Sequence, residues 1–252
     1  MPEDQRPPAA GDLTGWRPEN GPDLPDTLAA LAEGDLTVEG RLPWSSNLTF
    51  LVTIDGTGLR AVYKPLQGEQ PLWDFPGGLY RREVAAYLLS EALGWGLVPP
   101  TVARQRGPFG EGSLQLFVEA DYQQHYFTLM DEGAFLDRLR RMCAFDVVAN
   151  NADRKSGHVL RGTDDHIWGI DHGLCFHPSP KLRTVIWDFA GDEVPAADLA
   201  GLEGLADRLP DRLGELLTRQ ELERLHHRAA ELSTSGTFPC PDGDRPYPWP
   251  LV

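Results

Sequence analysis

The first half of the chain is dominated by strand-like patterns of apolar and polar residues. After a Pro-, Gly- and Asp-rich leader, residues 26–34 predict a short helix with Asp26 as its N-cap and Gly34 as its stop. Runs of alternating or β-branched residues then predict strands, separated by Gly, Pro, Asn and Asp turns. These runs cover residues 36–42, 47–54, 59–65, 98–106 and 112–119. The first three predict an antiparallel meander.

Helical spacing marks one segment of this β-rich half and most of the second half. Apolar residues recur every three or four positions over residues 79–94 and again over 131–148. Three shorter helix patterns follow, over residues 196–205, 209–218 and 220–232. The predicted fold class is therefore α+β, with an antiparallel β-rich N-lobe and a mainly helical C-lobe. We expect the segments to be a flexible leader with its short helix (1–34), the N-lobe (35–120), the C-lobe (121–235) and a Pro-rich tail (236–252).

Composition excludes several classes of protein. The length of 252 residues is sufficient for two lobes around a cleft. The formal net charge of −15 argues against nucleic acid as a partner, because a phosphate backbone requires a basic face. No apolar run reaches membrane-spanning length, so we expect no integral membrane segment. Three scattered cysteines and the lack of a signal-peptide pattern are typical of a cytoplasmic protein.

One predicted hairpin carries the candidate chemistry. A loop containing Asp153 leads into a short apolar strand at 159–160, and a polar turn leads into a second strand at 167–170. The second strand is followed directly by Asp171 and then by Gly173. Because a hairpin brings its two open ends together, we expect Asp153 and Asp171 to lie side by side. Two such carboxylates suit metal-assisted chemistry on an anionic substrate.

These residues resemble the catalytic and metal-binding loops of the protein-kinase-like superfamily, in its phosphatidylinositol 3- and 4-kinase-like and HipA-like branch. In that branch the first loop reads roughly Asp-Arg-His-x-x-Asn, and this chain has Asp-Arg-Lys-Ser-Gly-His over residues 153–158. The later Asp-Phe-Gly or Asp-His-Gly motif is Asp-His-Gly over residues 171–173. The chain looks most like an actinobacterial group of uncharacterised proteins of the phosphatidylinositol-kinase-like type. One departure is that His158 stands at the position of the metal-binding Asn.

The resemblance implies a bilobal kinase-like fold that binds ATP and Mg²⁺. Lys64, at the end of the third strand, would hold the α- and β-phosphates, and Glu83 on the 79–94 helix would pair with it. Five residues would contact the rest of the nucleotide, three in the turn between the first two strands and two in the hinge after the fifth strand: Ser45, Ser46, Asn47, Val118 and Glu119. The turn has no glycines, so small side chains would replace the glycine-rich loop of protein kinases.

The resemblance also implies roles in the transfer step. Asp171 would bind Mg²⁺, Asp153 would accept or orient the acceptor hydroxyl, and Arg154 or Lys155 would neutralise charge on the transferring group. His158 complicates this assignment, because imidazole suits Mn²⁺ or Zn²⁺ better than Mg²⁺. Three alternatives follow: no second metal, a preference for Mn²⁺, or nucleotide binding without transfer.

Several functions remain open on this sequence. The favoured one is an ATP-dependent phosphotransferase acting on a hydroxyl of a protein, lipid head group or small molecule. The alternative is a catalytically weak nucleotide-binding pseudokinase, and transfer of nucleotide monophosphate to protein is a third option. A different reading is a zinc site, made of His158, His172, Cys175 and His177. Asn150 and Asn151 are expected to brace their own loop rather than contact a ligand.

Overall fold

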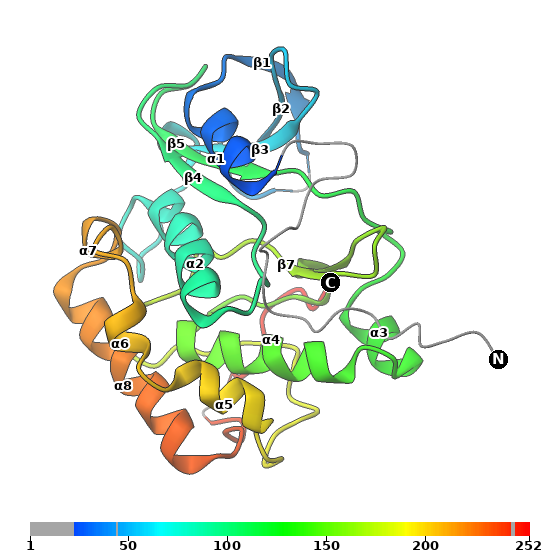
Figure 1. Ribbon diagram of the computed structural model, residues 1–252, viewed down its shortest axis with the longest axis vertical. Helices are drawn as coiled ribbons and strands as arrows, with labels where there is room; N and C mark the ends of the chain where they lie inside the picture. Colours follow the sequence, from blue (N-terminus) through cyan, green and yellow to red (C-terminus); the bar gives the residue numbers. More distant parts are fainter. Residues whose placement is uncertain (1–22, 44, 243–244) are drawn as a thin grey trace.

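The computed structural model describes residues 23–43, 45–242 and 245–252. The described chain folds into two lobes, an N-terminal lobe built on a β-sheet and a mainly helical C-terminal lobe (Figure 1). The predicted α+β class and two-lobe architecture are therefore confirmed. Residues 1–22 of the predicted leader lie outside the described ranges, whereas the short helix that follows them lies inside.

Within the described ranges, the N-lobe sheet contains five antiparallel strands in the order β1-β2-β3-β5-β4. Their bounds are Leu36–Arg41 (β1), Phe50–Ile54 (β2), Arg60–Pro65 (β3), Thr101–Arg104 (β4) and Gly112–Leu116 (β5). Each strand lies inside a run predicted from the sequence. The first three pair as the predicted meander.

The alternation along β3 decides where Lys64 points. Ala61 and Tyr63 are buried on one face of the sheet together with Leu31 of helix α1 (Leu24–Glu33). Because successive side chains of a strand alternate between faces, Lys64 projects from the other face, toward the C-lobe. Gly112 of β5 lies so close to β3 that a Cβ atom there would be 2.3 Å from the Lys64 carbonyl oxygen. A glycine is therefore required beside the strand that carries Lys64.

The short N-terminal helix begins earlier than predicted. The N-cap is Asp23, whose Oδ1 accepts a hydrogen bond of 3.2 Å from the backbone N–H of Asp26. Pro25 lies in the first turn, where its missing N–H costs nothing because such N–H groups have no partner within the helix. The predicted start at Asp26 is therefore wrong, since Asp23 takes the capping role and the Pro belongs to the helix.

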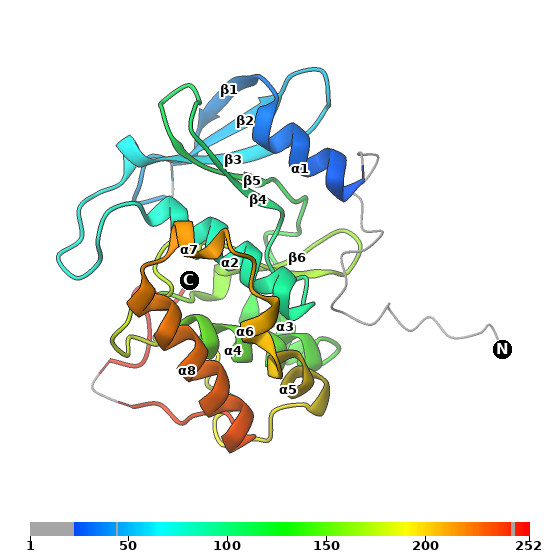
Figure 2. The same ribbon diagram turned by 60° about the vertical axis from the view of Figure 1, so that its left-hand side comes forward.

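Helix α2 (Leu79–Leu93) follows β3 in the chain and lies between the sheet and the C-lobe (Figure 2). It contacts β4 and β5 on one side and α6 and α7 on the other. The C-lobe elements are α3 (Tyr126–Glu132), α4 (Leu136–Ala149), β6 (Val159–Arg161), β7 (Ile167–Gly169), α5 (Ala196–Leu202), α6 (Leu205–Arg208), α7 (Leu213–Leu216) and α8 (Arg219–Ser235). Strands β6 and β7 pair as the predicted hairpin.

Three predicted helices are divided or shortened. The one predicted over 196–205 ends at Leu202 as α5, because Gly204 adopts a left-handed conformation before α6 begins. The long helix predicted over 131–148 covers the end of α3 and most of α4, because Gly133 adopts a left-handed conformation (φ 72°) and ends α3. The helix predicted over 209–218 is confined to the four residues of α7. Pro210 lies between α6 and α7, where its missing N–H prevents one continuous helix.

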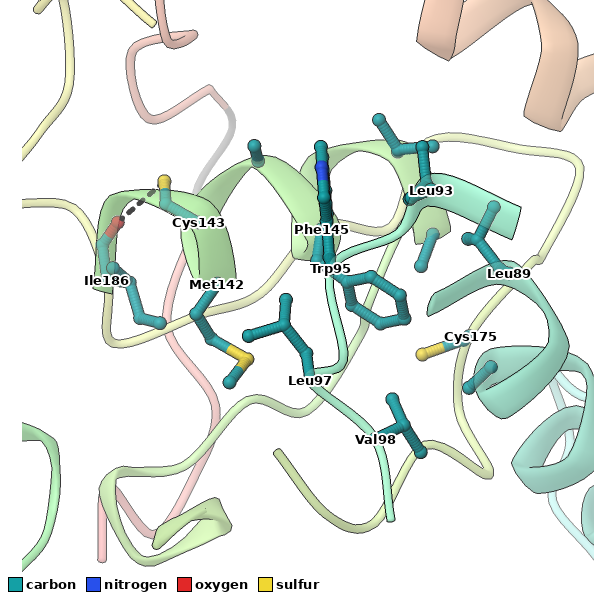
Figure 3. Close-up of a cluster of buried hydrophobic side chains, with 14 of the residues drawn as sticks. Leu89, Leu93, Trp95, Leu97, Val98, Met142, Cys143, Phe145, Cys175 and Ile186 are labelled. Atoms are coloured by element: carbon teal, nitrogen blue, oxygen red, sulfur yellow. Dashed lines mark hydrogen bonds between the residues drawn. The ribbon is translucent and has the colours of Figure 1, made fainter. Parts of the chain in front are cut away.

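The core of the C-lobe also includes α2. Leu89 and Leu93 of α2 are buried in the same apolar cluster as Met142 and Phe145 of α4 (Figure 3). Cys175, from the segment after the hairpin, is fully buried in this cluster. Half of α2 is thus an integral part of the C-lobe core, although the helix also covers the N-lobe sheet.

The segment after α8 returns to the loops of the C-lobe. The carbonyl of Pro246 accepts hydrogen bonds from the Thr184 N–H (3.1 Å) and the Trp187 indole N–H (3.0 Å). The carbonyl of Leu251 accepts one of 2.8 Å from the Ser156 N–H. No helix of the described ranges is long and apolar enough to cross a bilayer.

Candidate active site

A cavity of about 130 Å³ lies between the lobes and contains most of the predicted site residues. Its lining includes the following residues, each of which was predicted from the sequence: Ser45, Ser46, Asn47, Lys64, Glu83, Asp153 and Asp171. They come from the turn before β2, the end of β3, the first turns of α2 and the two ends of the β6–β7 hairpin. The expectation that the two ends of the hairpin meet is therefore confirmed.

Lys64 is held between two carboxylates. Its Nζ donates a hydrogen bond to Glu83 Oε1 and another, of 2.8 Å, to Asp171 Oδ1. Burial lowers the pKa of Lys64, but the charges of Asp171 and Glu83 outweigh that effect and raise the pKa above its usual value. Lys64 therefore stays protonated at every physiological pH.

Glu83 is buried and links Lys64 to the C-lobe. Burial raises the pKa of Glu83, while the charge of Lys64 opposes that effect. Its second oxygen, Oε2, accepts a hydrogen bond of 2.9 Å from the backbone N–H of His172. A Cβ atom on Gly173 would lie in van der Waals contact with Glu83 Oε1, at 3.4 Å, so the Asp171 loop passes directly beside this carboxylate. One carboxylate thus bridges the N-lobe lysine and the loop that carries Asp171.

Asp171 combines an ionised carboxylate with an unusual backbone. The charge of Lys64 lowers the pKa of Asp171 well below its usual range, although burial opposes the shift. Its φ of 61° lies in the left-handed region, which non-glycine residues rarely adopt. Such conformations concentrate at functional sites, where the surrounding structure imposes them. Half of the side chain is exposed, so its oxygens are accessible to a ligand in the cavity.

Asp153 is a carboxylate with the properties of a proton acceptor. Burial raises its pKa to about 6, against the opposing charge of Lys155. The Lys155 Nζ lies 3.3 Å from Asp153 Oδ2. Asp153 therefore changes protonation state near neutral pH, as an efficient general base does.

His158 lies beside Asp171, with 3.4 Å between its Nε2 and Asp171 Oδ2. Burial lowers its pKa to about 4, so the ring is neutral at physiological pH. A neutral imidazole nitrogen and a carboxylate oxygen at this distance suit ligation of one divalent cation. Within the described residues, no group of three or more His, Cys, Asp or Glu side chains could hold a metal ion.

Arg154 has a different role from the predicted one. Its guanidinium is fully buried and forms an ion pair with Asp146, with 2.9 Å from Nη2 to Oδ1. It also donates to the carbonyl of Ile170 (3.0 Å) and to Nε2 of His172 (2.8 Å). The prediction that Arg154 neutralises charge on the transferring group is therefore wrong, because solvent and ligands do not reach it. It connects the loop of Asp153 to the loop of Asp171 from inside.

Asn150 and Asn151 brace their loop, as predicted. The Asn151 side chain donates to Asp146 Oδ1 (2.9 Å) and accepts from the Asp153 N–H (3.0 Å). The Asn150 side chain donates to the carbonyls of residues 177 and 179. Sequence reasoning gave Asp146 no role, although a carboxylate among the apolar residues of a helix signals a buried cationic partner.

The zinc site is not formed. The His172 ring contacts Arg154, Cys175 is buried in the apolar core, and the His177 Nδ1 accepts from the Ser179 N–H at 3.0 Å. These side chains are therefore engaged in separate contacts and do not converge on one point with His158.

The turn over the cavity is fixed by a residue that the sequence did not single out. The N–H of Gln70 donates to Asn47 Oδ1, and its side chain donates to the Ser46 carbonyl, both at 2.9 Å. The hydroxyl groups of Ser45 and Thr49 are 2.8 Å apart. Gln70 follows β3 in the chain, so the turn is tied to the same segment that carries Lys64.

The predicted hinge residues do not line this cavity. Val118 packs beside the apolar pair Leu160 and Trp168, and the Glu119 carboxylate pairs with Arg60. Both follow β5 and precede the C-lobe, as a connection between lobes does. Their contact with adenine stays a prediction.

Comparisons with known proteins place the chain among kinase-like relatives. The model of the phosphatidylinositol 3- and 4-kinase family matches residues 76–200. The chain is 42% identical to protein Rv2133c of Mycobacterium tuberculosis over 267 residues, which covers 89% of this chain and 95% of that protein. It is 31% identical to phosphatidylinositol 4-kinase gamma 2 of Arabidopsis thaliana over 138 residues, or 42% of this chain and 24% of that protein.

Solved structures show the same fold at low sequence identity. A crystal structure of the Golgi casein kinase has a TM-score of 0.54 and 15% identity, covering 83% of this chain and 74% of that one. The structure of hydra Fam20 with sugar has a TM-score of 0.52 and 15% identity, covering 84% of this chain and 88% of that one. These structures show that the fold is kinase-like. The relative of nearly equal extent shows that the chain belongs to the family of protein Rv2133c, and residues 76–200 of the chain match the phosphatidylinositol 3- and 4-kinase family.

Proposed function

We propose that the protein is an ATP-dependent phosphotransferase that moves the γ-phosphoryl group to a hydroxyl of a protein, lipid head group or small molecule. The observation that carries the proposal is Lys64, held between Glu83 and Asp171 in the cavity that Asp153 also lines. A fixed cation, an accessible ionised carboxylate and a base near neutrality are the groups that phosphoryl transfer requires.

Each side chain has a distinct part in the proposed reaction. Lys64 binds the α- and β-phosphates, and Glu83 keeps its ammonium group in place. Asp171, with His158 beside it, would hold Mg²⁺ or Mn²⁺, and the cation would supply positive charge to neutralise the phosphates. The acceptor oxygen forms a bond to the γ-phosphorus while the bond to the β–γ bridging oxygen breaks, and ADP leaves. Asp153 takes the proton of the acceptor hydroxyl.

Lys155 is the remaining candidate for neutralising charge on the transferring group. Its side chain is partly exposed and its Nζ lies 3.3 Å from Asp153 Oδ2. From this position Lys155 can contact a phosphoryl group as it approaches Asp153. The buried Arg154 cannot make this contact.

A second candidate function is a nucleotide-binding pseudokinase. The observation in its favour is the neutral imidazole of His158 beside Asp171, where an oxygen donor would suit Mg²⁺ better. A module of this kind binds the nucleotide through Lys64 and Asp171 but transfers phosphate weakly or not at all.

ATP binding and turnover by the purified chain separate these functions. Both are measured with Mg²⁺ and with Mn²⁺, using ATP labelled at the γ- or the α-phosphate. Asp171→Ala is compared with Asp137→Ala, a matched variant at an aspartate whose side chain is 98% exposed on α4. Metal-dependent release or transfer of the γ-label that disappears only in Asp171→Ala supports the phosphotransferase.

Other outcomes are equally informative. Metal-dependent binding without turnover favours the pseudokinase, and covalent transfer of the α-label indicates transfer of nucleotide monophosphate. If the unaltered chain binds ATP with neither metal, the proposed function is refuted.

A further inference from the structure

Helix α2 carries a second buried ion pair, one residue before Glu83. Arg82 donates from Nη2 to Glu221 Oε1 of α8, and both side chains are nearly inaccessible. The Arg82 guanidinium also lies 5.8 Å from the ring centroid of Phe75. The pair joins two positions 139 residues apart in the chain. None of the chemistry proposed above uses it.

Arg82 and Glu83 point to different parts of the C-lobe. Neighbouring residues of a helix project about 100° apart, so Arg82 reaches α8 while Glu83 reaches Lys64 and the His172 N–H. The first turn of α2 is therefore attached to the C-lobe at two consecutive residues. The second half of the same helix is held in the C-lobe core by Leu89 and Leu93 (Figure 3).

Glu221 is itself held in one position. Its Oε2 accepts hydrogen bonds from the N–H and the hydroxyl of Thr218, both at 2.8 Å, which caps the start of α8. The Oε1 atom is thereby directed at Arg82. If the first turn of α2 moved away, two charges would remain buried without partners, which is strongly unfavourable. The pair thus penalises any displacement of the turn that carries Glu83.

We propose that Arg82 and Glu221 are positioning residues for the nucleotide site. They keep Glu83 against Lys64 before any ligand arrives, so the phosphate-binding lysine is oriented in the free protein. The consequence is that α2 needs no partner protein and no covalent modification to reach its working position. The inference rests on the proposed function insofar as it concerns ATP, whereas the position of α2 is measurable without nucleotide.

The test compares two variants that affect opposite sides of Glu221. Arg82→Gln removes the charge on α2 but leaves the cap of α8, whereas Thr218→Ala removes the hydroxyl contacts of the cap but leaves the backbone N–H contact to Glu221 and the ion pair. Arg82→Lys keeps the charge. The measurements are the dissociation constant for ATP with Mg²⁺, the thermal midpoint, and hydrogen exchange of the His172 amide without nucleotide.

We expect Arg82→Gln to weaken ATP binding about tenfold, a typical size for a change that acts through another residue. Exchange at His172 becomes faster, because its acceptor Glu83 is no longer held. Thr218→Ala lowers the thermal midpoint but changes these two quantities much less, because the ion pair and one contact to Glu221 remain. Arg82→Lys recovers most of the affinity. If Arg82→Gln does not fold, Glu221→Gln is measured in its place, because it removes the other charge of the pair.

Two results would overturn or redirect the inference. If Arg82→Gln lowers only the thermal midpoint, as Thr218→Ala does, the pair is structural and positions nothing. If the unaltered chain fails to bind ATP, the proposed function fails, but hydrogen exchange still tests the position of α2. Faster exchange at His172 in Arg82→Gln then supports the inference, and unchanged exchange contradicts it.

Discussion

Two groups of charged residues lie near the cleft and differ in burial: one lies behind it, inside the protein, and the other lines it. Arg154 and Asp146 are both inaccessible, and nearly every polar atom of the pair has a partner inside the protein. Lys64 and Asp171 line the cavity, and Asp171 is half exposed. The first group is saturated by the protein, whereas the second leaves oxygens and an ammonium group available to a ligand.

The difference teaches that charge alone does not identify a functional residue in this fold. An ion pair with all its hydrogen-bonding capacity used internally joins loops together and cannot bind a substrate. A pair that opens into a cavity, next to a carboxylate with a raised pKa and a backbone in the left-handed region, has the features of an active site. The two groups should therefore respond differently to loss of a single charge.

The largest effect is expected from Asp171→Asn. The amide keeps the shape but loses the charge for the metal, so turnover should fall about 10³-fold. Because Asp171 is half exposed, loss of its pairing with Lys64 should lower the unfolding free energy by only about 1 kcal/mol. Steady-state kinetics and urea titration measure the two quantities. If Asp171→Asn instead lost much stability and little turnover, Asp171 and Lys64 would behave like the buried pair of Arg154 and Asp146, and the comparison would fail.

Asp146→Asn should show the opposite balance. It leaves the Arg154 charge buried without its counter-ion, so the unfolding free energy should drop by about 3–5 kcal/mol. Asp137→Asn, at an exposed site on the same helix, provides the control and should change it by about 0.5 kcal/mol or less. Chemical denaturation of both variants measures the two changes in unfolding free energy. A loss of about 1 kcal/mol or less in Asp146→Asn would contradict the structural role.

Asp153→Asn should stabilise the protein while it reduces turnover. Because the folded-state pKa of Asp153 is raised to about 6, the native state binds more protons than the unfolded state between about pH 4 and 6. Stability contributed by the protonated carboxyl is therefore lost as pH rises through about 6. At pH 8 the variant should be more stable by about 2 kcal/mol, and the difference should vanish near pH 3.

The same raised pKa predicts how turnover of the unaltered protein depends on pH. Turnover should increase as Asp153 ionises and level off above about pH 6. Unfolding curves at several pH values test the expected stability of Asp153→Asn, and a pH–rate profile tests the expected turnover of the unaltered protein. An Asn variant that is less stable than the unaltered protein at pH 8 would show that the Asp153 charge is not unfavourable in the folded state.

The smallest effect is expected from His158→Asn. The change replaces a neutral imidazole by an amide oxygen beside Asp171, and hard cations prefer oxygen. The ratio of turnover with Mg²⁺ to turnover with Mn²⁺ should therefore rise a few-fold. Parallel assays with each metal measure this ratio. An unchanged ratio would mean that His158 does not ligate the cation.

Much of the site was predictable because its residues stand at the ends of elements. Lys64 ends a strand, Asp171 follows one, and Asp153 precedes a hairpin, so pattern and turn residues were enough to bring them together. The order of strands and helices was predictable for the same reason. Burial was not, and Arg154 was misassigned because a sequence records a charge but not its distance from solvent.

Contacts between distant positions were equally inaccessible to sequence reasoning. The Arg82–Glu221 pair spans 139 residues, and no local periodicity relates its members. Helix boundaries failed where one residue overrides propensity, as Gly133 does by adopting a positive φ. Gln70 was missed because a polar residue in a loop carries no signal of what its side chain holds.

The hydrogen bond from Ser156 to the Leu251 carbonyl has a consequence for biosynthesis. The loop that carries Asp153 leaves the ribosome well before residues 246–251, which satisfy its backbone and that of Thr184. During translation the acceptors of these hydrogen bonds are therefore synthesised after the loop itself. A nascent chain that has made both lobes but not this segment lacks these contacts. The loop of Asp153 is thus completed only after residues 246–251 have been made, although the residues of the loop itself are synthesised much earlier.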